Sequence, residues 1–107
     1  MIINMYSILD NKAEAFLPPF FMQNDGLARR AIVDCIRDPK HRFSSHPRDY
    51  ILFSIGIFDD LTGEIKSDLR EIVHVISLVD ADRANSQLLQ PEQADFLSTS
   101  DDSTPVG

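Results

Sequence analysis

The sequence contains a single cysteine, Cys35, no tryptophan, and no apolar run of the roughly 20 residues that a membrane-spanning helix needs. One cysteine cannot form an internal disulfide, so packing must hold the fold together, and a reducing, intracellular setting fits. The stretch from residue 1 to residue 12 lacks the basic start and the long apolar segment of a signal peptide. We therefore expect an intracellular globular protein without membrane contact.

Motifs that carry catalysis or hold cofactors are also missing. The sequence has no phosphate-binding glycine loop, no dinucleotide fingerprint, no nucleophile elbow and no CxxC pair. His41, His46 and His74 are not spaced as zinc ligands, and no cysteine pair accompanies them. We predict that the protein is not an enzyme and that it uses no cofactor and no metal.

The charge is negative overall but unevenly distributed. The formal net charge is −7, which argues against a general nucleic-acid coat and against binding to anionic membranes. Six of the ten basic residues fall in the middle of the chain: Arg29, Arg30, Arg37, Lys40, Arg42 and Arg48. After Arg83 the chain contains acidic residues but no lysine or arginine. The sequence thus predicts a basic middle and an acidic end.

The stretch 50–66 reads as a β-hairpin around which the rest of the chain is organised. Side chains alternate along a strand, so Ile51, Phe53, Ile55 and Ile57 share a wholly apolar face, which must be buried. The opposite face is mixed and carries Tyr50, Leu52, Ser54, Gly56 and Phe58. Residues 59–63 supply turn chemistry, and residues 64–66 begin the return strand.

A helix is predicted between Asn24 and Pro39. Asn24 or Asp25 can cap the first free N–H groups, and the residue before Pro39 avoids the α region. An apolar stripe at helical spacing consists of Leu27, Ala28, Ala31, Ile32, Cys35 and Ile36. We expect this stripe to pack on the apolar face of the hairpin and the arginines to point outward.

The remaining segments complete an α+β prediction. Residues 2–10 read as a strand in the centre of a sheet, whereas 13–17 fit either a short helical turn or a strand. For 72–79 we favour a strand, with a helix as the alternative. We predict one domain over 1–83, with a small antiparallel sheet of three to four strands and one main helix on one face. A disordered acidic tail is predicted over 84–107.

The basic middle is the best candidate for a functional site. We predict that single-stranded nucleic acid binds there, with phosphates on the cations and unpaired bases stacked on aromatic rings. The predicted contacts are Arg29, Arg30, Arg37, Lys40, Arg42, Phe43 and Tyr50. The structural alternative is a solvated helix face with the aromatic rings in the core.

A second hypothesis is a protein-interaction module. The segment LPPFF, which ends in Phe20 and Phe21, and the mixed face of the hairpin strand would bind another protein or a second copy. Net acidity favours this hypothesis, and an exposed sheet edge makes a homodimer plausible.

Four short segments of the sequence are informative when they are taken together. They are YSILDNKAEAFLPPFF from Tyr6, GLARR from Gly26, Asp38–Pro39, and HPRDYILFSIGIFDDLTG from His46. In this order they resemble the small nonstructural protein of gokushoviruses, which are Microviridae: tailless phages with single-stranded circular DNA genomes. The position of Arg48 is usually acidic in that family, and the segment after Lys66 is longer here.

The resemblance implies a non-capsid phage protein made during infection and located in the host cell cytoplasm. It also implies a role in viral DNA replication, through DNA binding at the switch toward single-stranded genomes. Under the second hypothesis the partner would be a host factor or the phage replication initiator. No catalytic or binding residue is carried over from the family.

Overall fold

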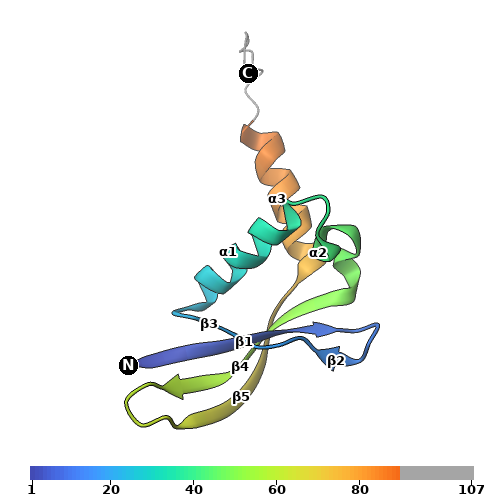
Figure 1. Ribbon diagram of the computed structural model, residues 1–107. Coiled ribbons are helices and arrows are strands. Elements are labelled where there is room, and N and C mark those ends of the chain that lie inside the picture. The colour runs from blue at the N-terminus through green and yellow to red at the C-terminus, as the bar shows by residue number, and fades with distance from the viewer. Residues whose placement is uncertain (90–107) are drawn as a thin grey trace.

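One antiparallel sheet forms the base of the molecule, and all the helices lie on one side of it (Figure 1). The computed structural model describes residues 1–89, with side chains through residue 85. The elements follow in the order β1 (Ile2–Asp10), β2 (Ala15–Phe16), β3 (Phe20–Met22), α1 (Asp25–Ile36), α2 (Arg42–Ser45), the 3₁₀ turn η1 (Pro47–Asp49), β4 (Tyr50–Asp59), β5 (Ile65–His74) and α3 (Val75–Leu89). The predicted α+β class is confirmed, but the sheet has five strands where three to four are predicted, because the short segments 15–16 and 20–22 also pair with β1.

Strand β1 lies in the centre of the sheet, as its two apolar faces predicted. The strand order is β2-β1-β4-β5, and β3 pairs with β1 on the same side as β2. The hairpin is also confirmed, because β4 and β5 pair antiparallel from Phe58–Ile65 at the turn to Ile51–His74 at the far end. Its turn is closed by the Gly63 N–H, which donates to the Asp59 carbonyl at 2.8 Å.

Helix α1 begins and ends where the sequence predicted. The Asn24 side chain accepts a hydrogen bond from the Leu27 N–H at 2.9 Å, which satisfies one of the free donors of the first turn. Ala28 and Ile32 point into the core and are 0% and 3% exposed. Leu27, in the same predicted stripe, is 46% exposed because it lies off the side of the helix that Ala28 and Ile32 bury.

The helices cover the opposite face of the hairpin from the one predicted. Tyr50 and Leu52 of the mixed face belong to the core together with Tyr6, Ile8, Ala28, Ile32, Phe43 and Val75. Cross-strand partners share a face, so the pair Ile8–Leu52 places Phe53 on the side away from the helices. Both faces of β4 carry large apolar groups, so alternation alone could not decide which one the helices would cover.

A β-bulge adds a second departure from the predicted alternation. Met5 pairs with Gly56 but Tyr6 pairs with Ser54, so Ile55 is an extra residue in β4. Gly56 has a φ of +152°, and a Cβ there would collide with the Lys66 carbonyl oxygen. The backbones of β4 and β5 therefore approach at Gly56 more closely than any side chain would allow.

Segment 72–79, for which the sequence allows a strand or a helix, contains the end of a strand and the start of a helix. The favoured strand is correct through His74, but α3 begins at Val75, which is fully buried against the core. Helix α3 continues to Leu89, past the predicted domain boundary at residue 83. The rest of the predicted tail, residues 90–107, lies outside the described residues.

Candidate nucleic-acid interface

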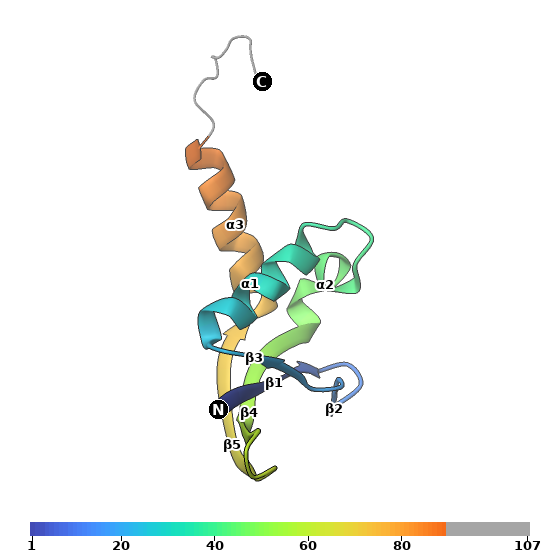
Figure 2. The same ribbon diagram turned by 60° about the vertical axis from the view of Figure 1, so that its left-hand side comes forward.

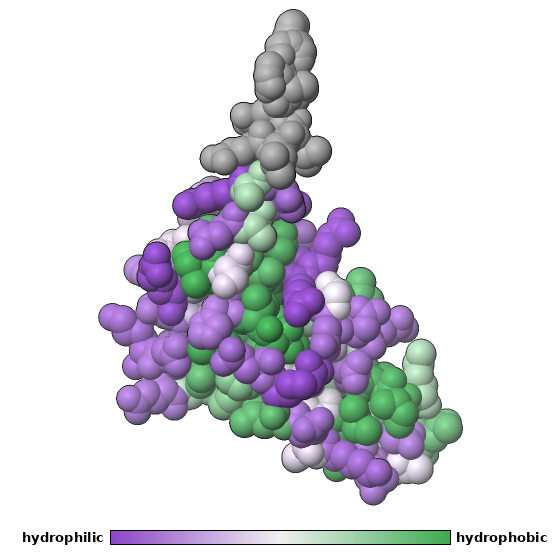
Figure 3. All heavy atoms as spheres, turned by 180° about the vertical axis from the view of Figure 1, so that it is seen from behind, coloured by the Kyte–Doolittle hydropathy of each residue, from purple (hydrophilic) through white to green (hydrophobic). Residues whose placement is uncertain are grey.

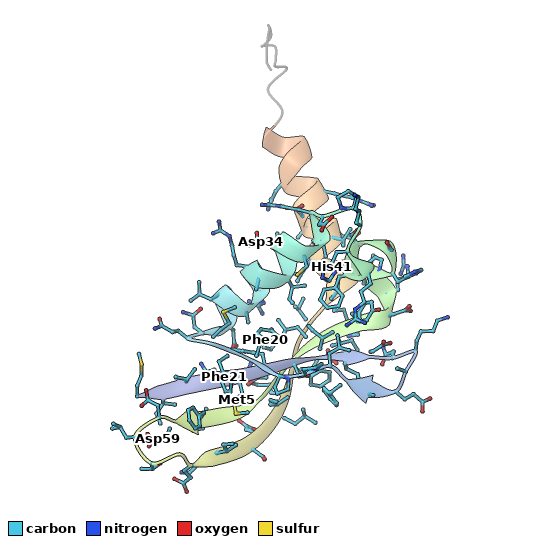
Figure 4. The ribbon with its side chains drawn as sticks, in the orientation of Figure 1. Met5, Phe20, Phe21, Asp34, His41 and Asp59 are labelled. Carbon is cyan, nitrogen blue, oxygen red and sulfur yellow. The ribbon has the colours of Figure 1, made fainter. Side chains whose placement is uncertain are left out.

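The predicted phosphate-binding residues begin on the outer side of α1. Ala28 and Ile32 occupy the buried side of this helix; Arg30 lies opposite to it and Arg29 on its flank, and both arginines are exposed. Acidic residues lie close to them: Asp25 precedes Arg29 by one turn, and Asp34 follows Arg30 by one turn. Asp34 lies on the outer side of α1 in Figure 4. The two arginines are accessible to a ligand, but carboxylates reduce the positive potential around them.

Arg37 is not free to bind a phosphate in this conformation. Its Nη2 lies 2.7 Å from Oδ1 of Asp82 in α3, and its Nε donates to the same carboxylate at 3.2 Å. This bidentate contact raises the pKa of Arg37 and lowers that of Asp82. The pair links the C-terminal end of α1 to α3, so Arg37 serves as a structural cation here.

The two predicted stacking rings lie in the core. Phe43 and Tyr50 are each 6% exposed, and their ring centroids are 4.7 Å apart. The His41 ring packs on Phe43 with 4.5 Å between ring centroids, and His41 Nδ1 accepts a hydrogen bond from the Phe43 N–H. Neither ring presents a free face to a base, so the structure does not support the stacking prediction for these two residues.

Arg42 lies beside this buried aromatic pair and remains exposed. Its guanidinium carbon is 5.9 Å from the ring centroids of both Phe43 and Tyr50, which is within cation–π range. The guanidinium N–H groups donate no hydrogen bond to another described residue, so they are available to a ligand. Lys40, in the loop before α2, is likewise exposed.

A groove next to Arg42 was not foreseen from the sequence. It has a volume of about 430 Å³ and lies between α1 and the β2–β3 side of the sheet. Its walls are formed by Ile8, Leu17, Pro18, Phe20, Met22, Ala31, Ile32, Cys35, Arg42 and Phe43. The groove is apolar apart from the guanidinium, and the LPPFF segment and the α1 stripe were the only signals for it. Desolvation by burial raises the pKa of the Cys35 thiol in its wall, so the thiol stays protonated at neutral pH.

A second hollow gathers cations near η1. It has a volume of about 410 Å³ and is lined by Lys12, Ser45, His46, Pro47, Arg48 and Asp49. Lys12 arrives from the β1–β2 turn, which the Asn11 N–H fixes by donating to the Asp49 carbonyl at 2.8 Å. Lys12 lies 36 positions before Arg48 in the chain, so no local pattern of charge connects the two residues.

The two phenylalanines proposed for partner binding lie on opposite sides of β3 (Figure 4). Phe20 pairs with Tyr6 and stacks on its ring at 5.8 Å, so it belongs to the helical side. Phe21 pairs with Met5, is 51% exposed, and lies 6.0 Å from the Phe58 ring on the far side of the sheet. Of these two, only Phe21 therefore offers an exposed ring. Helices cover Tyr50 and Leu52 of the mixed face of β4, whereas Phe58 lies beyond the bulge on the far side of the sheet.

The described residues contain neither a metal-binding cluster of side chains nor a helix that could cross a membrane. Through residue 85, no three histidine, cysteine, aspartate or glutamate side chains are grouped so that they could hold a metal ion. No helix in the described part of the chain combines the length and the apolar character that crossing a membrane requires.

Comparison with known proteins places the chain in a family. A family model described as "Phage ORF5 protein" matches residues 3–81, which run from the second residue of β1 through β5 into the first part of α3. Searches of curated proteins and of solved structures gave no match. The match covers most of the sequence and ends just before Asp82. The chain belongs to the Phage ORF5 protein family.

Proposed function

We propose that this phage protein is a nonstructural protein of gokushoviruses that binds single-stranded DNA during genome synthesis in the host cell cytoplasm. Family membership supports the phage origin. The runs between Tyr6 and Gly63 that resemble the gokushovirus protein support the finer assignment and the role in DNA replication. The location follows from that role, because phage genomes are copied inside the host cell.

One observation carries the DNA-binding proposal: four exposed cations lie on the helical side of an acidic protein. We call Arg29, Arg30, Lys40 and Arg42 the basic surface. The salt bridges between described residues involve none of these four. A polyanion would gain most of its binding energy from such charges by releasing counterions. Arg37 is left out of the surface because Asp82 holds it.

The groove beside Arg42 is the proposed seat of an unpaired base. An apolar wall that includes Phe20 would cover the base, while the adjacent guanidinium of Arg42 would bind the phosphate next to it. In this proposal the base binds in the groove and does not stack on Phe43 or Tyr50, because those two rings are buried in the core. It also predicts a preference for single strands, since a paired base could not enter the groove.

Fluorescence anisotropy with a labelled oligothymidine across a salt series tests this proposal. Four phosphate contacts predict that the logarithm of affinity falls with the logarithm of salt concentration with a slope of about −3. Arg30→Gln and Arg42→Gln should each weaken binding and make the slope shallower by about 0.7. Lys66→Gln, which removes an exposed cation from β5, is the matched control and should change little.

Two results would contradict the proposal. One is the absence of binding at low salt, where charge-driven association is strongest. The other is an equal loss of affinity in Arg42→Gln and Lys66→Gln, because this would show that net charge rather than the basic surface determines binding.

A second candidate function is a protein-interaction module that binds a host factor or the phage replication initiator. The exposed ring of Phe21 on the far side of the sheet favours it. Under this function, capture of the partner from a lysate should survive nuclease treatment. Phe21→Ser should then reduce capture more than Arg30→Gln, whereas the DNA-binding function predicts the reverse for oligonucleotide affinity.

A further inference from the structure

The face of the sheet away from the helices is apolar and uncovered. Figure 2 shows the helices together on one side of the strands, and Figure 3 shows hydrophobic side chains at the surface in the lower, strand-bearing part of the molecule. We call this surface the open face. By strand register and contact it carries Ile3, Met5, Leu9, Phe16, Phe21, Phe53, Ile55, Phe58, Ile65 and Leu69. Ile51 lies on the same side of the sheet but is only 6% exposed. No helix between residues 1 and 89 packs over it.

The open face combines projecting side chains with a hollow. Phe21, Ile65 and Leu69 are 51%, 60% and 63% exposed. A hollow of about 540 Å³ lies among Ser7, Phe16, Leu17, Pro18, Pro19, Ile55 and Leu69. Two aromatic contacts, Phe16–Phe53 at 5.3 Å and Phe21–Phe58 at 6.0 Å, hold the rings in place before any partner arrives. Such a surface loses little side-chain entropy when it binds.

The charges on the open face do not suit a polyanion. Among the described residues whose partners place them on this face, the charged side chains are Glu71, opposite Phe53, and His74, opposite Ile51. These two face each other at 3.2 Å between Nε2 and Oε2. Arg70 lies on the helical side, where its Nη1 contacts Asp25 at 3.0 Å. Without cations, DNA or an anionic membrane would gain no electrostatic attraction here, so the surface fits another protein.

We propose that the open face binds a second copy of this chain, with the two sheets stacked face to face about a two-fold axis. A two-fold interface places the same patch against itself, so the patch must be complementary to itself. An apolar face with both projections and a hollow meets this condition. The stacked sheets would lie about 10 Å apart, as in a β-sandwich.

Charge favours this geometry over other contacts between copies. Each copy carries a net charge of −7, so contacts through charged surfaces would bring like charges together. Stacking through the open face puts the helices and the basic surface on the outside of the dimer. This interface would also remove exposed apolar surface from water, because the side chains of Phe16, Phe21, Ile65 and Leu69 are all at least 44% exposed.

The sheet edge is a poorer dimer contact than the open face. Strand β5 is the longest of the edge strands, since β2 and β3 on the other edge have two and three residues, but its pairing with β4 shifts register twice, between Leu52 and Phe53 and between Ser54 and Gly56. It also carries four charged residues in its middle, Lys66, Asp68, Arg70 and Glu71. Bulges and charges are the devices by which natural proteins prevent edge-to-edge pairing.

Sedimentation equilibrium of the full chain without DNA tests the proposal. We expect twice the 12.1 kDa chain mass at micromolar concentrations. Leu69→Lys should weaken dimerisation at least tenfold, because it places a charge in the apolar interface. Leu27→Lys is the matched control: Leu27 is 46% exposed on α1, the charge change is the same, and dimerisation should be unaffected. Ile65→Lys is a second open-face variant in case Leu69→Lys does not fold, and circular dichroism verifies folding.

Three outcomes would overturn the proposal. The first is a mass of 12.1 kDa at a few hundred micromolar protein, which would leave the open face to a different protein. The second is equal weakening of the dimer by Leu27→Lys and Leu69→Lys. The third is hydrogen-exchange protection of the outer β5 amides that rises with protein concentration, since edge pairing protects these amides and face-to-face stacking does not.

Discussion

The buried hydroxyl of Tyr6 connects the sheet, helix α1 and strand β5. Tyr6 is fully buried, and its hydroxyl donates to Oδ1 of Asp25 at 2.8 Å, while Arg70 contacts the other carboxylate oxygen at 3.0 Å. Burial, followed by the bond to Asp25, raises the pKa of Tyr6 to about 12. The hydrogen bonds from Arg70 and then from Tyr6 lower the pKa of Asp25. Three elements thus share one charged hydrogen-bond network.

This network predicts a loss of stability in alkali. The pKa of Tyr6 is about 12 in the folded chain, against an ordinary value of 10.0, so the unfolded chain releases the proton first. The contribution of Tyr6 is therefore complete below pH 10.0 and disappears as the pH rises to about 12. Urea unfolding at several pH values should show this decline.

Tyr6→Phe removes the titrating group and supplies the comparison. At neutral pH it should lower the free energy of unfolding by about 1–2 kcal/mol, because a charged hydrogen bond is lost. The variant should also show less of the alkaline decline. Tyr50→Phe is the control, since the Tyr50 hydroxyl has no hydrogen-bond partner among the described side chains, and an equal effect from both variants would refute the role of the network.

Gly56 marks the closest approach between β4 and β5. Gly56→Ala should destabilise the protein by about 3 kcal/mol, because the new Cβ meets the Lys66 carbonyl and the strands must separate. Gly63→Ala is the control: Gly63 also has a positive φ, +76°, but its Cβ would meet nothing within 4 Å. We expect about 1 kcal/mol there from backbone strain alone. Equal costs in urea unfolding would contradict the steric explanation.

At the level of elements, the predictions are correct where residues close in the sequence determine the structure. The Asn24 cap and the stripe around Ile32 correctly defined α1, and the apolar alternation from Ile2 correctly defined a central strand. The covered face of β4 was predicted wrongly, because that choice depends on Tyr6 and Ile8 of a distant strand. The start of α3 was missed because Val75 fits a strand and a helix equally well.

The candidate site was predictable only in part, for a related reason. The exposed positions of Arg29 and Arg30 follow from helical periodicity. The engagement of Arg37 depends on Asp82, which is 45 residues away, and no local pattern reveals that contact. The burial of Phe43 likewise depends on how α2 and η1 fold onto Tyr50.

The contact between α1 and α3 predicts an effect on DNA affinity. Asp82→Asn removes the carboxylate that holds Arg37 and adds a cation to the basic surface. Oligothymidine should bind more tightly at low salt, with the salt slope steeper by about 0.7. Asp80→Asn, an equal charge change at an exposed position of α3, is the control for net charge. A similar gain in both variants would mean that freeing Arg37 is irrelevant.

At the scale of the whole molecule, the net negative charge opposes DNA binding, whereas the exposed cations of the basic surface favour it. Residues 90–107 contain four carboxylates, Glu92, Asp95, Asp101 and Asp102, and no cation. Truncation after Leu89 therefore changes the net charge from −7 to −3. We expect oligothymidine affinity to rise several-fold at low salt and the gain to fade at high salt.

A full-length variant with amides in place of those four carboxylates separates charge from length. If charge is the cause, this variant should reproduce the gain of the truncated chain. Unchanged affinity in both would show that the acidic segment does not compete with DNA for the basic surface.

Strand β5 runs directly into helix α3, so a movement at the end of the strand would be transmitted to the helix. His74 ends the strand and Val75 begins the helix, with no loop between them to absorb motion. A helix of 15 residues is about 22 Å long, so a tilt of about 10° at its base would displace its tip by about 4 Å. A ligand that alters the twist of β5 would therefore move the far end of α3, and a fluorescent label attached there could detect this movement.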